Sequence, residues 1–207
     1  MIGPLLTLMM AATPCPMAPP ETSFVLPATG FVWASGGEEG ACDKVDAGEW
    51  TRVSAGEGEL AVAATGPEGS GRYWVVTVGL AAARGGEPAR GVCLMASTLG
   101  WRTMQDEAPL EWVRRAQGSE APEIVLWDTF QADTESPADA ALVAWVYQLR
   151  GDSLVLDLES TRRLAAKLAA VYRKPLPREG SSLREIRGKA ATALTALAEG
   201  RCTVAGR

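Results

Sequence analysis

The chain has 207 residues, 47% of them hydrophobic and 22% charged, which suits one folded domain with appendages and argues against wholesale disorder. The formal net charge is −5 and no segment concentrates basic residues, so the electrostatic footprint of a nucleic-acid-binding protein is absent. The chain has no histidine, which excludes Ser-His-Asp and Cys-His catalysis and any zinc site that needs an imidazole ligand. We therefore expect a protein that is not an enzyme and uses no cofactor or metal.

The N-terminal 20 residues carry no charged side chain, and an apolar run over 5–12 leads into four prolines. This run is too short to cross a bilayer, which takes about 20 apolar residues, but it matches the apolar core of a secretory signal. We expect 1–20 to be a signal peptide cleaved near Ala12 or Ala18, although no Lys or Arg precedes the run. The mature chain would then have no transmembrane span and would reside in the periplasm or cell envelope. An uncleaved apolar extension is the alternative.

Four cysteines, at spacings that match no metal-binding motif, are Cys15, Cys42, Cys93 and Cys202. In an oxidising compartment an even number of cysteines predicts two disulfides, for which three connectivities exist. We expect Cys15–Cys42 and Cys93–Cys202. Lipid attachment to Cys15 would need a small residue before it, where Pro14 stands, so we expect a plain secretory signal. In the cytosol the four residues would instead be buried or idle thiols.

Residues 21–48 are rich in Gly, Pro and acidic residues and form a predicted N-terminal arm with two short apolar stretches. Strand patterns begin after this arm and alternate most clearly in the segment that contains Trp74, Val76 and Val78. The composition of 66–71 predicts a turn, and 100–118 has no clear pattern. Strands are predicted over 49–54, 59–65, 72–80, 91–98, 124–131, 142–149 and 153–159.

The last two predicted strands flank 150–152, where a glycine favours a hairpin turn. Leu154, Leu156 and Leu158 are predicted to point inward from the second of them. A helix over 139–148 is the rival to the strand over 142–149. The Ala-rich composition favours the helix, whereas the aromatic and β-branched residues favour the strand.

The C-terminal part changes to a helical period. Ser160 can cap a first helix, whose apolar stripe includes Leu164 and Leu168 and which Pro175 ends. A second helix is predicted over 189–199, with Gly200 at its C-terminal cap.

Strands followed by helices predict a mainly β fold with C-terminal helices, of the α+β class. The β part is expected to be an antiparallel barrel or sandwich. We divide the chain into a signal peptide (1–20), the arm (21–48), an antiparallel β domain (49–160) and a helical segment packed on it (161–207).

Several short stretches resemble small lipocalin-like, calycin-type proteins of the bacterial envelope. These are Gly48-Glu-Trp50, Gly58-Glu-Leu-Ala-Val62, Gly71-Arg-Tyr-Trp-Val75 and the hairpin over 147–158 with the helices that follow it. The resemblance covers about 48–199 and lies in the pattern of strands and turns. It implies an exported antiparallel barrel, often lipidated, and assigns a function to no residue.

Four features are candidate sites. Arg150-Gly151-Asp152 is the cell-adhesion tripeptide, although hairpin chemistry explains it better. Gly66 to Gly71 lacks the Gly-Lys-[Ser/Thr] end of a phosphate loop. The acidic cluster Asp128, Asp133, Glu135 and Asp139 lacks the spacing of a calcium loop, so a solvated acidic loop is favoured.

Tryptophan is abundant, with seven residues against three Tyr and three Phe. Most of them are expected in the core, but those in predicted strands are candidates to line a barrel mouth and stack on a ligand. These candidates are Trp74, Trp127 and Trp145.

The sequence thus predicts an exported lipocalin-like domain that binds a small apolar ligand or an envelope component, without catalysis. The alternative is a structural or protein-interaction module of the envelope that docks a partner protein through an apolar patch or its arm. A hydrolase built on two carboxylates would need a facing pair, and no pattern in the sequence supplies one.

Overall fold

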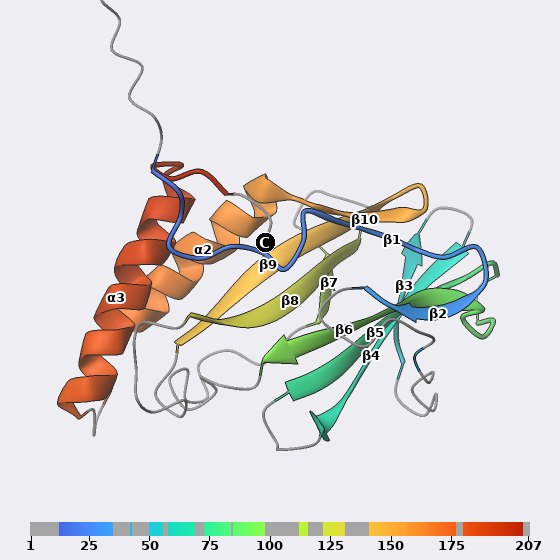
Figure 1. Ribbon diagram of the computed structural model, residues 1–207, viewed down its shortest axis with the longest axis horizontal. Coiled ribbons are helices and arrows are strands. Elements are labelled where there is room, and N and C mark those ends of the chain that lie inside the picture. The colour runs from blue at the N-terminus through green and yellow to red at the C-terminus, as the bar shows by residue number, and fades with distance from the viewer. Residues whose placement is uncertain are drawn as a thin grey trace, which may run out of the picture.

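The computed structural model describes residues 13–34, 42, 50–55, 58–68, 73–83, 85–97, 112–115, 122–130, 141–176 and 180–204. These residues form two five-stranded β-sheets and two C-terminal helices (Figure 1). The predicted fold class, mainly β with C-terminal helices, is therefore confirmed. Within this part of the chain the strands belong to two separate sheets and close no barrel.

The first sheet has the order β1-β10-β9-β8-β7, and every neighbouring pair is antiparallel. Its central strand β9 was the segment with a helical rival over 139–148, and the strand prediction is confirmed. The first seven residues of β9 are all buried because both faces of the sheet are covered, so neither the alternation of a strand nor the period of a helix shows there. The strands are β1 (Ser23–Val25), β7 (Val113–Arg115), β8 (Pro122–Phe130), β9 (Ala141–Arg150) and β10 (Ser153–Leu156).

The second sheet has the order β2-β6-β5-β4-β3, in which only the β2–β6 pair is parallel. Four strands lie where the sequence predicts them, but β4 continues to Glu68, so the turn expected over 66–71 is wrong for its first three residues. A register shift between Thr65 and Glu68 accommodates Gly66 and Pro67 within the strand. The strands are β2 (Gly30–Trp33), β3 (Thr51–Ala55), β4 (Gly58–Glu68), β5 (Tyr73–Ala81) and β6 (Arg90–Ser97).

The segment predicted as an N-terminal arm contributes an edge strand to each sheet. β1 pairs with β10 in the first sheet and β2 pairs with β6 in the second. Phe24 and Phe31 are buried on these strands. The described part of the arm is therefore built into the sheets rather than detached from them.

Both helices follow the first sheet along the chain and lie at the opposite end of the molecule from the second sheet (Figure 1). They are α2 (Leu158–Arg173) and α3 (Ser181–Ala198). α2 begins earlier than predicted because Asp157, not Ser160, is its N-cap, so Leu158 is helical rather than part of a strand. Pro175 follows the C-cap of α2 as expected. Gly200, predicted as the C-cap of α3, instead follows the C-cap Glu199 and has a φ of 67°.

α3 begins at Ser181, about two helical turns before the predicted start at residue 189. Its buried stripe already includes Ile186, one helical turn before Ala190. Gly188 and the charged residues around it conceal this continuation in the sequence.

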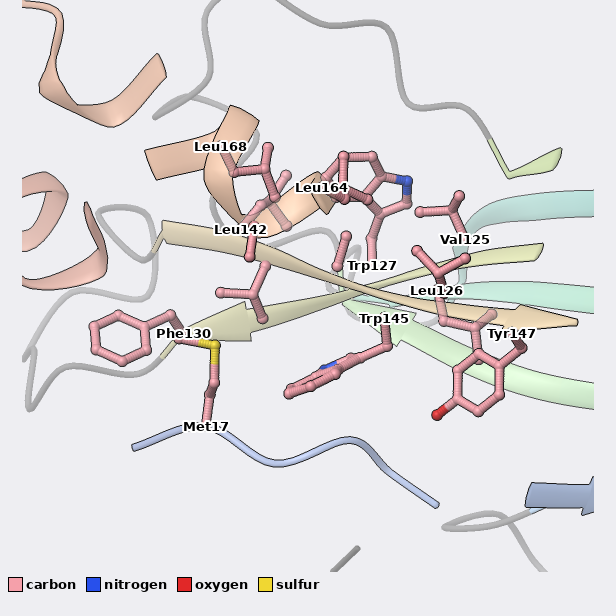
Figure 2. Packing of buried hydrophobic residues seen from close by; sticks show 14 of the residues in the cluster. Met17, Val125, Leu126, Trp127, Phe130, Leu142, Trp145, Tyr147, Leu164 and Leu168 are labelled. Carbon is pink, nitrogen blue, oxygen red and sulfur yellow. The ribbon is translucent and has the colours of Figure 1, made fainter. Parts of the chain in front are cut away.

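One hydrophobic core joins the sheets, the helices and the N-terminal segment. On one face of the first sheet, Trp127 and Leu142 lie toward Leu164 and Leu168 of α2 (Figure 2). On the other face, Phe130 and other buried side chains lie toward Met17 of the N-terminal segment (Figure 2). Both faces of the sheet are covered, so its strands need apolar residues in both directions.

Two disulfides are present, but their pairing differs from the predicted Cys15–Cys42 and Cys93–Cys202. Cys15 is bonded to Cys202, and Cys42 is bonded to Cys93. The first pair forms because the two ends of the described chain run side by side. Pro14 forms a parallel bridge with Thr203, and the Cys15 amide donates to the Thr203 carbonyl over 2.9 Å. Proximity in the sequence was therefore a poor guide to proximity in the fold.

Candidate functional site

Two of the tryptophans predicted to line a ligand site, Trp127 and Trp145, do not converge. In the β8–β9 register, Trp145 is opposite Leu126, whereas Trp127 is opposite Ala144. Successive residues of a strand point to opposite faces, so Trp127 and Trp145 lie on opposite sides of the first sheet (Figure 2). Both are buried, and the side chain of Trp74, from β5 of the second sheet, lies outside the described residues. Trp127 and Trp145 therefore cannot stack on one ligand in one pocket.

In the adhesion-like tripeptide, Arg150 ends β9, and Gly151 and Asp152 form the turn to β10. Gly151 has a φ of 59°, which glycine adopts readily. The Asp152 carboxylate accepts an ion-paired hydrogen bond from Arg90 of β6, and the Asp152 carbonyl accepts from the Leu26 amide. The turn thus joins the first sheet to the second, which supports the structural interpretation of this motif.

The acidic cluster is described only at Asp128, in β8, because Asp133, Glu135 and Asp139 lie outside the described residues. Among the residues that the structure describes, no three His, Cys, Asp or Glu side chains gather in a way that could hold a metal ion.

A polar cluster that the sequence did not reveal lies where α2 begins over the first sheet. Glu123 of β8 is only 1% exposed, yet it carries a carboxylate. Arg114 of β7 donates to Glu123 Oε2 over 2.7 Å, and the Ser160 hydroxyl donates to Glu123 Oε1. The alternating pattern around Ile124 gives no sign of this burial, because Glu123 reads as a solvent-facing residue of a half-exposed strand.

Ser160 is the centre of this cluster. Its Oγ lies 2.6 Å from Asp157 Oδ2 and accepts a hydrogen bond from Arg163 over 2.7 Å. A hydroxyl carries one proton, so Ser160 donates to Glu123 or to Asp157 but not to both at once. Ser160 has no exposed surface, and its hydroxyl is therefore closed to a substrate. The arrangement fastens α2 to β8 instead of forming a nucleophilic site.

Asp157 is the N-cap of α2, and its Oδ1 accepts from the amides of Glu159 and Ser160 at 3.1 Å each. Burial by itself raises the pKa of this carboxyl, but the hydrogen bonds from Ser160 and Glu159 and the charge of Arg163 outweigh it and lower the pKa below its ordinary value. The carboxylate form therefore stabilises the fold at pH values above the pKa of Asp in the unfolded chain. This contribution is lost as the pH falls through the lower, folded-state pKa.

We expect Asp157→Ala to lower the free energy of unfolding by about 1–2 kcal/mol at neutral pH, because α2 loses its cap. Asp157→Asn keeps a cap oxygen and should lose less, but the part of the acid sensitivity that Asp157 causes should disappear. Urea unfolding between about pH 2 and pH 7 measures both effects. An unchanged pH profile in Asp157→Asn would contradict the assignment.

A surface hollow of about 300 Å³ lies between the end of α2 and the first half of α3. Its lining includes the cationic residues Arg173, Lys174 and Arg184, and no acidic side chain is among its described lining residues. Ala191 and the buried Tyr172 form part of its wall. Neither the sequence pattern nor the tryptophan count pointed to this place, since its residues come from two helices whose facing sides only the packing defines.

Tyr172 is held firmly at this wall. Its hydroxyl accepts from the Leu142 amide over 2.7 Å and donates to the Leu142 carbonyl over 2.8 Å. Behind it, the Arg187 guanidinium lies over the Tyr172 ring, 5.3 Å from its centroid, and donates to the Val171 and Lys174 carbonyls. The end of α2, the start of α3 and β9 are thus joined into one rigid support for the hollow.

No helix in the described part of the chain has the length and apolar character to span a bilayer. Comparison with protein-family models, with curated proteins and with solved structures finds no match to this chain. The lipocalin-like resemblance therefore stays a prediction.

Proposed function

We propose that this protein is exported and works in the periplasm or cell envelope as a binding module without catalytic activity. The observation that carries the proposal is that all four cysteines are paired in two disulfides. Structural disulfides persist in oxidising compartments and are rare in the cytosol. Cys93 is fully buried and Cys202 is 6% exposed, so both bonds are integral to the packed fold.

The ligand of this module is a small molecule or an envelope component. The hollow between α2 and α3 supports this, because it opens to solvent while its wall is braced by the hydrogen bonds of Tyr172. Binding sites are commonly concave and largely preformed. A closed lipocalin-like barrel is not needed for this role, and the described strands form two sheets.

Processing of the N-terminus tests the export. Residues 13–20 belong to the fold: Cys15 forms a disulfide, and Met17 and Pro19 are buried. Cleavage near Ala18 would remove Cys15 and Met17, whereas cleavage near Ala12 retains both. We therefore expect the native protein from the envelope fraction to begin near Thr13.

Intact-mass measurement before and after reduction checks this expectation. The native mass should lack about the first 12 residues. Reduction should add the mass of two hydrogen atoms for each of the two disulfides. A full-length chain with free thiols in the cytosol would refute the proposed function, and an N-terminus at Pro19 would refute the processing site alone.

A further inference from the structure

We infer that two copies of this chain associate through β1, the edge strand of the first sheet, which pairs in antiparallel register with β1 of the other copy. The inference goes beyond the proposed binding role and does not depend on where the protein resides. β1 stands first in the strand order, and within the described part of the chain β10 is its only neighbour in the sheet (Figure 1). One side of β1 is therefore open to a further strand.

The register of β1 on β10 shows which main-chain groups point to this open side. The Leu26 amide donates to the Asp152 carbonyl, so Leu26 directs its main-chain groups toward the β9–β10 hairpin. Along an edge strand, residues that bond to the neighbour alternate with residues whose amides and carbonyls point away from it. Val25 and Ser23 therefore direct these groups outward, and both residues are exposed.

β1 lacks features that protect the other sheet edges. Edge strands are commonly guarded by charged side chains, prolines or a covering segment. β3 carries Arg52, β7 has the sequence Val-Arg-Arg, and the Cys42 amide donates to the Phe31 carbonyl of β2. By contrast, β1 has the sequence Ser-Phe-Val, without a charge or a proline. Among the described residues its Val25 is the one large apolar side chain that is exposed, at 69%.

A second copy fits this edge because the antiparallel pairing is self-complementary. With a two-fold axis at Phe24, Ser23 of each copy lies opposite Val25 of the other, and these two residues can exchange both of their main-chain hydrogen bonds. The same register thus satisfies the outward groups of both copies. The two Val25 side chains become diagonal neighbours on the exposed face of the joined sheet and cover each other in part.

The charges that flank β1 favour the same arrangement. Glu21 precedes β1, is partly exposed and forms no ion pair with a described residue. In the two-fold register it lies opposite Pro27 of the other copy, and the carbonyl of Pro27 accepts a hydrogen bond from Arg90 over 3.3 Å. Each Glu21 carboxylate therefore approaches Arg90 of the other copy, where Asp152 already forms an ion pair. This complementarity occurs at both ends of the paired strands and favours a second copy over an unrelated strand.

The test measures the association of the full disulfide-bonded chain by sedimentation equilibrium from micromolar to millimolar concentration. We expect a reversible dimer, because β1 is short and buries little surface. Val25→Pro removes an amide that β10 does not use, so it should weaken the dimer at least about tenfold through two lost hydrogen bonds. Val25→Thr is the matched control, since it keeps the amide and the branched shape and should dimerise nearly as well as the parent.

A charge variant tests the same interface from outside β1. Glu21→Lys brings a cation toward Arg90 of the other copy, and we expect it to weaken the dimer about threefold to tenfold at low ionic strength. Glu199→Lys changes the net charge equally at a glutamate that is 55% exposed and lies after α3, so it should leave the association unchanged. Equal effects of the two lysine variants would contradict the proposed contact.

The register is tested by nuclear magnetic resonance on a mixture of isotope-labelled and unlabelled copies. Phe24 on the axis forms a pair without hydrogen bonds, in which the two α-carbons lie about 4.5 Å apart. We expect a cross-peak between the Phe24 α-protons of a labelled and an unlabelled copy. A dimer without this cross-peak would overturn the inference.

Two further results would also overturn it: a chain that stays monomeric at millimolar concentration, and a dimer that Val25→Pro does not weaken. A monomeric chain that adds a strand of a different protein at β1 would likewise rule out the second copy. Each variant should keep the far-ultraviolet spectrum and melting temperature that the parent shows as a monomer, so lost association cannot reflect misfolding. If Val25→Pro fails this control, Glu21→Lys and the cross-peak decide the question.

Discussion

Replacing both Cys15 and Cys202 with serine is expected to lower the free energy of unfolding by about 5 kcal/mol. The bond joins residues 187 positions apart, so it removes nearly the largest loop entropy available to this chain in its unfolded state. The same bond holds the N-terminal segment in place. Without it, the Pro14–Thr203 bridge and the buried Met17 rely on hydrogen bonds and packing alone.

Guanidinium unfolding followed by tryptophan fluorescence measures this loss, since the buried Trp127 and Trp145 report on the core. The double replacement Cys42→Ser with Cys93→Ser is the comparison. Its loop spans 51 residues, so the entropy model predicts a smaller loss of about 4 kcal/mol. A negligible loss in the Cys15 and Cys202 variant would show that the N-terminal segment docks without the bond.

Replacing Glu123 with alanine is the second large effect, with an expected loss of about 3–5 kcal/mol. Removal of this buried carboxylate takes away a hydrogen-bond acceptor from the groups that donate to it. The Arg114 guanidinium, 20% exposed, loses its 2.7 Å ion pair, and the Ser160 hydroxyl keeps only Asp157 as an acceptor. A cavity beside the start of α2 adds to the cost.

Two matched variants separate the contribution of the Glu123 charge from that of its volume and burial. Glu123→Gln keeps the volume and one acceptor oxygen, and we expect it to lose less than the alanine variant. Glu159→Ala removes a carboxylate that pairs with Arg163 on the same helix but is 82% exposed, so it should change stability by less than about 0.5 kcal/mol. Equal effects of Glu123→Ala and Glu159→Ala in urea unfolding would contradict the burial of Glu123.

Most elements could be predicted from the sequence because their signals are local. The alternation over β5, the hairpin glycine at 151 and the proline after α2 each reflect the geometry of a few neighbouring residues. The start of α2 was predicted wrongly because two nearby residues, Asp157 and Ser160, are both good N-caps. Only the hydrogen bond of Ser160 to Glu123 shows that Asp157 is the cap that is used.

The candidate sites could not be predicted in the same way, because they depend on contacts between residues that are distant along the chain. Tryptophan side chains are large enough to line a ligand site, yet the strand register places Trp127 and Trp145 on opposite faces of one sheet. The hollow between α2 and α3 consists of common residues, and no spacing in the sequence distinguishes Arg184 from any other surface arginine.

The sequence by itself determined the fold class, the order of most elements and the absence of imidazole chemistry, because composition and short-range periodicity carry that information. The tertiary structure alone decided the disulfide pairing, the burial of Glu123 and the convergence of cations on one hollow. Each of these is a contact between residues distant along the chain. Such contacts are set by sheet register and helix packing, which depend on the whole core rather than on any local pattern.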